Sequence, residues 1–510
     1  CCDASIVSFN NVPILATNSP NKLFDSLSAG KPVIVNSSGW TKDLVEKDNC
    51  GFFVDPDNPN DLVDKLLEVK DNKELLKQWG ENSRRLSLEV YDFGKSGKRF
   101  GKCNKMKELM EFIKKYATPF YLFDDKGFIA NYQHLCKAFQ DIYPNYTLAY
   151  SYKTNYMPHV CLLVKRLGGY AEVVSDMELT LALKIGYSHD FIIYNGPCKG
   201  VLMENHILCG GISNIDSVAE AERVIALAKH HPDKQLKVGL RINSDIGANF
   251  ISRFGLQIDS EDIQQVVDEI KRQPNLRLVG LHMHVSRARH LSAWQKRIDN
   301  ILYAADKYID GIPEYIDLGS GMFADMEDYL KEQFTIEVPT YEEYARVVAG
   351  TMAKHYGACE SKPILFTEPG TTVVSRYLSL FTSVIGLKVI ARKHYAVVDS
   401  DYHHVGETGH MMRCPYTVIE GNDAGEVLAA PVDVVGYTCL EQDILMREMP
   451  ESLSVGDVIQ FRNVGGYSIV YKPPFIQPNC PVMALTEEDA VVEIKRAETF
   501  DDIFQTFKFE

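Results

Sequence analysis

The stretch Ala149-Tyr150-Ser151-Tyr152-Lys153-Thr154-Asn155 is the segment from which the fold and the chemistry can be worked out. It is a short apolar and aromatic run, typical of a buried strand, and it ends in a lysine. A charged amine at the end of a buried strand must be paired, neutralised or bonded. A lowered pKa would make the Lys153 amine a nucleophile suited to Schiff-base chemistry. Taken alone, the stretch favours an ordinary lysine at a strand end, and the segments downstream reverse that preference.

Predicted strands and helices alternate from about residue 118 to 385. Eight strands are expected, at 147–151, 170–174, 191–194, 212–215, 237–242, 277–284, 315–318 and 363–368, with helices such as 177–185, 217–228, 260–272, 293–308 and 341–355 between them. This alternation predicts an α/β fold in the form of a closed parallel (β/α)8 TIM barrel. Such barrels carry their chemistry at the C-terminal ends of the strands, where Lys153, His284, Gly319–Gly321 and Glu368 would lie.

The regions on either side of the barrel have different patterns. Residues 1 to about 100 alternate strand and helix, with a helix start at Asn18-Ser19-Pro20, and predict a partial Rossmann-like α/β segment. Residues 91–107 are interpreted as a linker or a crossing helix. After about residue 386, short β runs at 381–391, 394–398, 427–435, 458–461 and 468–471 predict an antiparallel β domain. The predicted domains are therefore 1–100, 101–385 and 386–510.

Composition narrows the class of protein. The 510 residues are 45% hydrophobic, which is enough for more than one domain. The net charge of −15 and the lack of a long basic run argue against nucleic acid and anionic membranes as partners. No apolar stretch approaches the roughly 20 residues of a membrane helix. Twelve cysteines without a C-x-x-C spacing suggest neither zinc nor a disulfide framework, and favour a cytoplasmic protein. The chain begins at Cys1, so it reads as a piece of a longer polypeptide or a processed one.

Three segments at predicted strand ends supply polar groups, each with a plain structural alternative. Leu318-Gly319-Ser320-Gly321 could bring backbone N–H groups to an anion or could simply turn the chain. Leu281-His282-Met283-His284 puts two histidines on one side of a strand, which is compatible with a metal, a flat cofactor or a packed core. Glu368-Pro369-Gly370 leaves a carboxylate that needs a cationic or N–H partner, such as a protonated pyridine nitrogen or an arginine.

Two segments of the β domain complete the candidate set. The stretch from Gly436 to Asp443 holds Cys439 with two acids, Glu441 and Asp443. A cysteine can be a proton donor or a nucleophile, or a half-buried residue beside solvated acids. Gly465-Gly466-Tyr467 is a glycine turn that presents a tyrosine, or else a packed tyrosine corner.

These segments, in this order, resemble the diaminopimelate/ornithine/arginine decarboxylase family of pyridoxal-phosphate enzymes, which has an alanine-racemase-like fold. The resemblance covers roughly residues 105 to 480. Further motifs that carry it are Val174-Ser175-x-x-Glu178-Leu179, Asn195-Gly196-Pro197-x-Lys199, Arg253-Phe254-Gly255 and Asp317-Leu318-Gly319-x-Gly321. The resemblance implies pyridoxal 5'-phosphate as the cofactor, decarboxylation of an α-amino acid as the reaction, and no metal.

The resemblance also implies roles for the residues around the cofactor. Lys153 would form the aldimine with the cofactor, and Glu172 would be the acid near that lysine. His284 would stack on the ring, and Glu368 would pair with the pyridine nitrogen and make the ring an electron sink. The phosphate would be bound by Gly319, Ser320 and Gly321, with Tyr467 approaching from the β domain.

The remaining implied roles concern proton transfer and assembly. Cys439 or Lys153 would return a proton to the α-carbon after CO2 leaves. In this family the cysteine loop comes from the second subunit, so a homodimer with a shared active site is expected. Two alternatives stay open: an amino acid racemase or epimerase of the same cofactor class, against which the Cys439 loop argues, and a non-catalytic cofactor-binding or scaffold protein.

Three departures from the family pattern bear on the substrate. Ser286-Arg287 stands where the family has Gly-Ser, and Thr371 stands where it has arginine. We expect Arg287 to compensate by supplying the phosphate or carboxylate charge missing at Thr371. The family places an acid directly after the cysteine, where it binds a distal amine of the substrate. This chain has Leu440 at that position. Glu441 and Asp443, which follow it, are candidate substrate-binding residues. An acidic, masked or carrier-linked amino acid is therefore a candidate substrate.

The first 95 residues carry a separate resemblance. Asn18-Ser19-Pro20-Asn21-Lys22-Leu23-Phe24-Asp25, followed by Ala29-Gly30-Lys31-Pro32-Val33-Ile34, is similar to the C-terminal end of a family 4 GT-B glycosyltransferase. Asp25 stands where a carboxylate of that family binds the ribose of a sugar nucleotide. Only the last part of that fold is expected here, so no glycosyl transfer is predicted for this chain alone.

Overall fold

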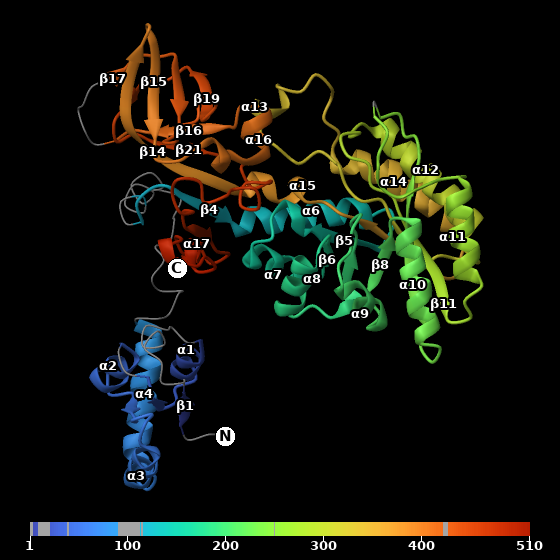
Figure 1. Cartoon of the computed structure of the whole chain (residues 1–510). Coiled ribbons are helices and arrows are strands. Elements are labelled where there is room, and N and C mark those ends of the chain that lie inside the picture. Colours follow the sequence, from blue (N-terminus) through green and yellow to red (C-terminus); the bar gives the residue numbers. More distant parts are fainter. Residues whose placement is uncertain are drawn as a thin grey trace. The chain divides into compact units, whose positions relative to one another are not determined.

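The structure is a computed structural model that describes residues 4–8, 21–37, 40–89, 113, 116–248, 250–421 and 427–509. It divides into two compact units, of which one is Cys1–Met110 with Thr486–Val492 and the other is Glu111–Leu485 with Glu493–Glu510. We call them the N-terminal unit and the main unit. Figure 1 traces both along the chain, and each is described by itself.

Eight parallel strands of the main unit close into a barrel, as predicted. They are β5 (Tyr146–Ser151), β6 (Tyr170–Val173), β7 (Ile192–Tyr194), β8 (Ile212–Ile215), β9 (Leu236–Asn243), β11 (Leu276–His282), β12 (Tyr315–Asp317) and β13 (Ile364–Thr367). Each strand pairs with the next, and β13 pairs with β5 to close the ring. A short additional strand, β10 (Leu256–Gln257), pairs with β9. The closed ring leaves no free sheet edge, and the C-terminal ends of all eight strands lie at the same end of the barrel.

Helices between the strands surround the barrel (Figure 1). They are α7 (Pro158–Arg166), α8 (Asp176–Lys184), α9 (Leu202–Leu208), α10 (Val218–His230), α11 (Glu261–Lys271), α12 (Leu291–Tyr308) and α14 (Tyr341–Tyr356), with α6 (Asp125–Gln140) before β5. Hydroxyl caps start several of them: Ser175, Ser217 and Ser260 each accept the backbone N–H three residues on. These caps satisfy N–H groups that a helix start would otherwise leave unpaired.

Side chains of the strands fill the barrel. One core cluster takes Ala149, Ile193, Val279, Tyr315 and Phe366 from five different strands. Tyr315 fits because Gly280 faces it: a Cβ on Gly280 would lie 2.4 Å from the Tyr315 ring. The interior is therefore packed, and a ligand can only be bound at the strand ends.

A second sheet forms the β domain of the main unit. Its long strand β14 (Leu378–Ile390) pairs antiparallel with β15 (Lys393–Val398), β21 (Val458–Phe461) and β4 (Phe120–Asp124). The other strands are β16 (Tyr416–Ile419), β18 (Val432–Val435), β19 (Ile444–Met449), β22 (Val482–Leu485) and β23 (Val491–Lys495), and β17 (Val427–Leu428) pairs with β20 (Leu453–Ser454). Most pairings are antiparallel, as predicted, but β15–β18 and β22–β4 are parallel.

Two features of the β domain differ from the sequence-based expectation or refine it. Residues 468–471, predicted as a strand, form a turn, in which the Tyr471 N–H donates to the Ser468 carbonyl. The strand β14 runs through residue 385, where we expected the barrel to end, and β4 joins this sheet from before the barrel. The chain therefore enters the barrel from the β domain and returns to it. The division into three domains stays a prediction.

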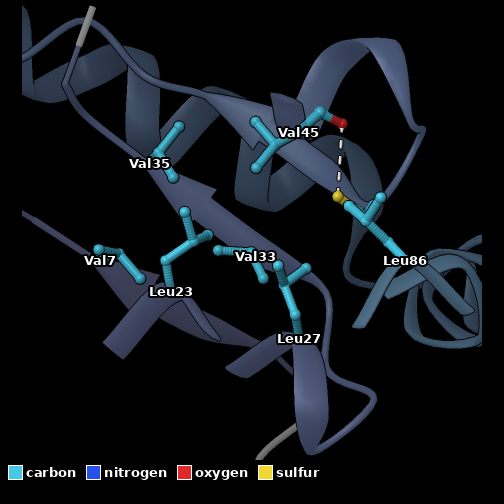
Figure 2. Packing of buried hydrophobic residues seen from close by; sticks show 8 residues of the cluster. Val7, Leu23, Leu27, Val33, Val35, Val45 and Leu86 are labelled. Carbon is cyan, nitrogen blue, oxygen red and sulfur yellow. Dashed lines mark hydrogen bonds between the residues drawn. The ribbon is translucent and has the colours of Figure 1, made fainter. Parts of the chain in front are cut away.

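The N-terminal unit is a small parallel sheet with helices. Its strands β1 (Ser5–Val7), β2 (Val33–Val35) and β3 (Gly51–Phe53) alternate with α1 (Asn21–Ser28) and α2 (Trp40–Lys47), and α3 (Pro59–Val69) and α4 (Lys73–Glu89) follow. Figure 2 shows its core, in which Leu23 and Leu27 of α1 pack with Val33, Val35 and other buried side chains. The predicted helix start at Asn18–Pro20 and linker at 91–107 lie outside the described residues, as does the side chain of Asp25.

None of the helices in the described part of the chain is long and apolar enough to cross a membrane.

Candidate active site

Lys153 lies at the C-terminal mouth of the barrel. Strand β5 ends at Ser151, and a short 3-10 turn, Tyr152–Thr154, presents the lysine. The Lys153 Nζ donates to Glu172 Oε2 at 2.8 Å, and Ser151 Oγ donates to the same oxygen at 2.6 Å. Glu172 is buried at the end of the neighbouring strand β6. The register of β5 and β6 places Ser151 opposite Glu172, which is why the lysine meets this carboxylate.

The pKa of Lys153 is raised, so of the three options for a buried amine the structure shows the paired one. Burial by itself lowers the pKa of the amine, but the carboxylates of Glu172 and Glu368 outweigh burial. An opposite charge at hydrogen-bond distance favours the charged form of the amine. Lys153 is therefore held as an ammonium group, paired and oriented toward Glu172.

Glu368 is the second buried carboxylate at the mouth, directly after β13. It is hydrogen-bonded to His282 Nε2 at 3.2 Å and accepts a short bond from Asn195 Nδ2. The Asn195 amide also reaches Glu172 Oε1 at 3.3 Å, so it bridges the two carboxylates. Asn214 Nδ2 in turn donates to Asn195 Oδ1 at 2.9 Å. The network fixes Glu368 and Glu172 relative to each other.

Glu368 and its neighbour Asp317 carry opposite pKa shifts. Burial would raise the pKa of Glu368, but His282, Lys153 and hydrogen bonding bring it well below its ordinary value. Burial and the charge of Glu368 raise the pKa of Asp317 well above its ordinary value. Glu368 is therefore the ionised member of the pair, and it can hold a proton on a nitrogen base brought next to it.

His282, Asp317 and Glu368 also have the spacing of a metal site, with one ligand atom each within 4.8 Å of the others. Among the described residues they form the one cluster with this geometry. We interpret it as a hydrogen-bond network, because His282 Nε2 is already bonded to Glu368. The prediction of no metal stays a prediction.

His284 and the glycine loop form the opposite wall. The backbone N–H of Ser320 donates to His284 Nδ1 at 3.1 Å, which leaves the ring proton on Nε2. Burial, Lys153, Arg297 and Arg241 lower the pKa of His284 well below its ordinary value, so the imidazole is neutral. It is a flat, uncharged ring, suited to contact with a flat aromatic ligand.

Arg297 holds this loop by hydrogen bonds, and no motif pointed to it. It lies in the middle of α12, is fully buried, and donates to the carbonyls of Val285, Leu318 and Ser320 at 2.8 to 2.9 Å. Burial lowers its pKa to about 10, so it stays charged at neutral pH. One buried cation thus fixes both the His284–Val285 strand end and the glycine loop.

A cavity of about 420 Å³ opens above these groups. It brings together most of the predicted site residues, namely Lys153, His284, Arg287, Ser320, Gly321, Glu368 and Tyr467. Glu172 and Gly319 lie directly behind it, bonded to Lys153 and Glu368 respectively. Sequence reasoning did not single out four of its other lining residues, Arg289, Glu407, His410 and Tyr471, of which the last three come from the β domain. The cavity is therefore built by the barrel and the β domain together.

Comparison with known proteins shows which families the two units are similar to. Residues 129–375 match the model of the pyridoxal-dependent decarboxylase family, pyridoxal binding domain. The barrel of this chain is therefore similar to the pyridoxal-dependent decarboxylase family. Residues 19–86, in the N-terminal unit, match the model of glycosyl transferases group 1.

Similar individual proteins are diaminopimelate decarboxylases. The one from Methanocaldococcus jannaschii is 24% identical over 420 residues, covering 78% of this chain and 92% of the relative. Its crystal structure superposes with a TM-score of 0.67 at 21% identity, covering 79% of this chain and 94% of that one. The arginine decarboxylase of Paramecium bursaria Chlorella virus has the same fold, with a TM-score of 0.59 at 21% identity over 72% of this chain. The fold of the barrel and β domain is thus that of this family.

The groups around this cavity are compatible with pyridoxal 5'-phosphate. Ser320 Oγ is buried beside the cavity without a hydrogen-bond partner among the described residues, as a phosphate-binding hydroxyl would be. Gly319 cannot carry a side chain, because a Cβ would lie 2.5 Å from His284, so the loop packs closely against the ring. Lys153, Glu368 and His284 offer an amine, an ionised carboxylate and a neutral ring on one cavity. These are the groups that an aldehyde-bearing pyridine phosphate needs.

The predicted Cys439 loop does not line the cavity of its own chain. Cys439 and Glu441 are exposed. Asp443 is buried and accepts hydrogen bonds from its own surroundings: Tyr402 N at 2.8 Å, Thr438 N at 2.9 Å and Thr438 Oγ1 at 2.6 Å. Asp443 therefore holds the loop in shape, whereas the cysteine is presented to the outside.

Proposed function

We propose that this chain decarboxylates an α-amino acid with pyridoxal 5'-phosphate as its cofactor. The observation that carries the proposal is the arrangement of Lys153 between the carboxylates of Glu172 and Glu368, across one cavity from the neutral ring of His284. Bound at this site, the cofactor would supply an electron sink for the charge left at the α-carbon when CO2 leaves. The family of the barrel supports both the reaction and the cofactor.

The chain's own residues would divide the remaining tasks. Lys153 Nζ would hold the cofactor covalently and would give way to the amine of the substrate. Glu368 would hold a proton on the pyridine nitrogen, because it is ionised, buried and fixed by His282 and Asn195. His284, a neutral imidazole on the cavity wall, would contact the face of the ring.

The phosphate would be held at the glycine loop. Ser320 offers its buried hydroxyl, and Gly319 and Gly321 allow the backbone to come close. Tyr467 approaches from the β domain, and its backbone N–H is fixed by the Thr154 carbonyl at 3.0 Å. Arg287, on the cavity wall with φ of 66°, supplies the positive charge that Thr371 does not.

Proton return would involve a second copy of the chain. Cys439 is exposed and does not line the cavity of its own chain, so as a proton donor it would serve the cavity of a partner. We therefore propose a homodimer with shared active sites, in which Cys439 or Lys153 protonates the α-carbon. We assign no glycosyl transfer to the N-terminal unit by itself.

Two measurements on the full chain test the proposal. Borohydride reduction after incubation with pyridoxal phosphate should attach the cofactor to the peptide that contains Lys153, and Lys153→Ala should abolish the label. Lys153→Arg is the matched control that keeps the charge next to Glu172 but cannot form the link. Release of CO2 is then measured across a panel of α-amino acids. Labelling without CO2 release from any of them, or with only racemisation, would refute the decarboxylase.

A further inference from the structure

A second cavity adjoins the cofactor cavity, with a volume of about 370 Å³. The two cavities share four lining residues, Arg287, Arg289, Thr371 and Glu407. These four side chains therefore form a threshold between the cavities. Thr371, which has a small side chain, is one of them.

The walls of the second cavity are mainly apolar. The segment after β12 contributes a compact cluster of Phe323, Met326 and Leu330, with Ala324, Phe334 and Met412 packed against it. The elements that form the walls are α13 (Asp328–Lys331) and α16 (Gly406–Met411), which lie close together in Figure 1. A cavity of this kind favours an apolar chain over a hydrated charge.

One polar atom in the second cavity has no partner. Asn463 is buried, and its Nδ2 donates to Thr408 Oγ1 at 3.1 Å, but its Oδ1 has no hydrogen-bond partner among the described residues. Burying an amide oxygen without a donor is unfavourable, and buried polar groups are nearly always bonded. A donor on a ligand in the cavity would satisfy it.

The charges at the threshold argue against a second cation. Arg287 and Arg289 carry two positive charges there, against the one negative charge of Glu407. A substrate with a distal ammonium group would meet two arginines and then an apolar wall. A substrate whose distal end is neutral meets neither obstacle.

We propose that the second cavity binds the part of the substrate remote from the α-carbon, and that this part is an uncharged apolar chain with a hydrogen-bond donor for Asn463. The substrate class is therefore an α-amino acid whose distal amine is masked, for example as an amide. This inference rests on the proposed function, since it assumes that the α-carbon lies next to Lys153.

Lysine and Nε-acetyllysine test the proposal as a matched pair, because they share a chain and differ in the masking of the distal amine. With the full chain loaded with cofactor, kcat/KM for Nε-acetyllysine should exceed that for lysine at least about tenfold, the discrimination that a hydrophobic pocket can supply. Equal values, or a preference for lysine or diaminopimelate, would overturn the inference.

Two variants locate the effect in the second cavity. Ala324→Phe fills it without touching the cofactor cavity, and should raise KM for Nε-acetyllysine about tenfold while the absorbance of bound cofactor is unchanged. Ala324→Ser is the size-matched control and should behave as the parent. Asn463→Gly is tolerated at φ of 63° and should remove the preference for Nε-acetyllysine over norleucine. Parental kinetics in both Ala324→Phe and Asn463→Gly would place the substrate elsewhere.

A binding measurement separates failure of this inference from failure of the proposed function. Titration of the cofactor-loaded chain with each amino acid, followed by the change in cofactor absorbance, needs no turnover. If no amino acid releases CO2, the proposed function is wrong. Tighter binding of Nε-acetyllysine than of lysine would still support binding of a masked distal amine in the second cavity. Tighter binding of lysine, or no binding of either, overturns the inference.

Discussion

Replacing Glu172 by glutamine should make Lys153 easier to deprotonate. Glu172 Oε2 lies 2.8 Å from Lys153 Nζ, and a carboxylate at such a distance raises a lysine pKa by about one to three units. The Lys153 side chain is 35% exposed, so solvent screens part of this interaction, and Glu368 still acts on the amine. We therefore expect a fall in the Lys153 pKa of about one to two units in Glu172→Gln.

The sign of the kinetic effect follows from the nucleophile. Only the neutral amine attacks the cofactor aldehyde, and lowering its pKa by one to two units raises the neutral fraction near neutral pH about ten- to a hundredfold. The assay mixes cofactor-free protein with pyridoxal phosphate over a pH series and follows the visible absorbance of the linked cofactor. The pH at half-maximal rate should move down by about one to two units in the variant.

Ser151→Ala is the matched control for this experiment. It removes the 2.6 Å hydrogen bond to the same Glu172 oxygen but leaves the negative charge, so the pH profile should stay close to that of the parent. A profile for Glu172→Gln that superposes on the parent profile would refute the reasoning, because Glu172 would then not control the protonation of Lys153. A shift of the same size in Ser151→Ala would attribute the effect to hydrogen bonding instead of charge.

Three further predictions concern the support of the site and its assembly. Glu220→Ala leaves the fully buried Lys199 ammonium without its 2.7 Å partner. Chemical denaturation should show a free energy of unfolding lower by about 3–5 kcal/mol. The double variant Lys199→Met/Glu220→Leu should recover most of the lost stability. Arg297→Met unpairs three buried carbonyls around the glycine loop and should weaken pyridoxal phosphate binding at least about tenfold in equilibrium dialysis, with an unchanged far-UV CD spectrum. Equal mixing of inactive Lys153→Ala and Cys439→Ala chains, with subunit exchange, should restore about a quarter of the activity, because half of the dimers are mixed and each mixed dimer has one intact site; no recovery would contradict the shared site.

The barrel could be predicted from the sequence because its strands are short apolar runs between helix-start signals. The predicted strand at 212–215 coincides with β8, and Ser217 caps the helix that follows. Residues 468–471 misled the prediction because Ser-Ile-Val-Tyr has the composition of a strand. There, tertiary hydrogen bonds such as Tyr467 N to the Thr154 carbonyl hold the chain in a turn. Local preference was overridden by a contact between segments more than 300 residues apart.

The candidate site could be predicted only in part, for a related reason. Motifs point to residues near a strand end, so Lys153 and Glu368 were found, but they say nothing of which groups touch. The bridge from Asn195 to Glu368 joins residues 173 positions apart, and it exists only once β7 and β13 are in one barrel. The raised pKa of Lys153 follows from such contacts, so the sequence could not decide whether this amine is paired or neutralised.

The two cavities divide the groups of the proposed reaction from the proposed binding site for the rest of the substrate. Lys153, Glu172, His284 and Glu368 follow barrel strands and are fixed by strand register and buried hydrogen bonds. The second cavity is built instead from the segment after β12 and from α16, outside that register, so its shape can change without moving the reacting groups. Thr371 is the point where the two meet, because it lines both. Thr371→Arg should therefore close the second cavity to a long neutral side chain and leave the Lys153 label in place, whereas loss of the label would mean that position 371 serves the cofactor instead.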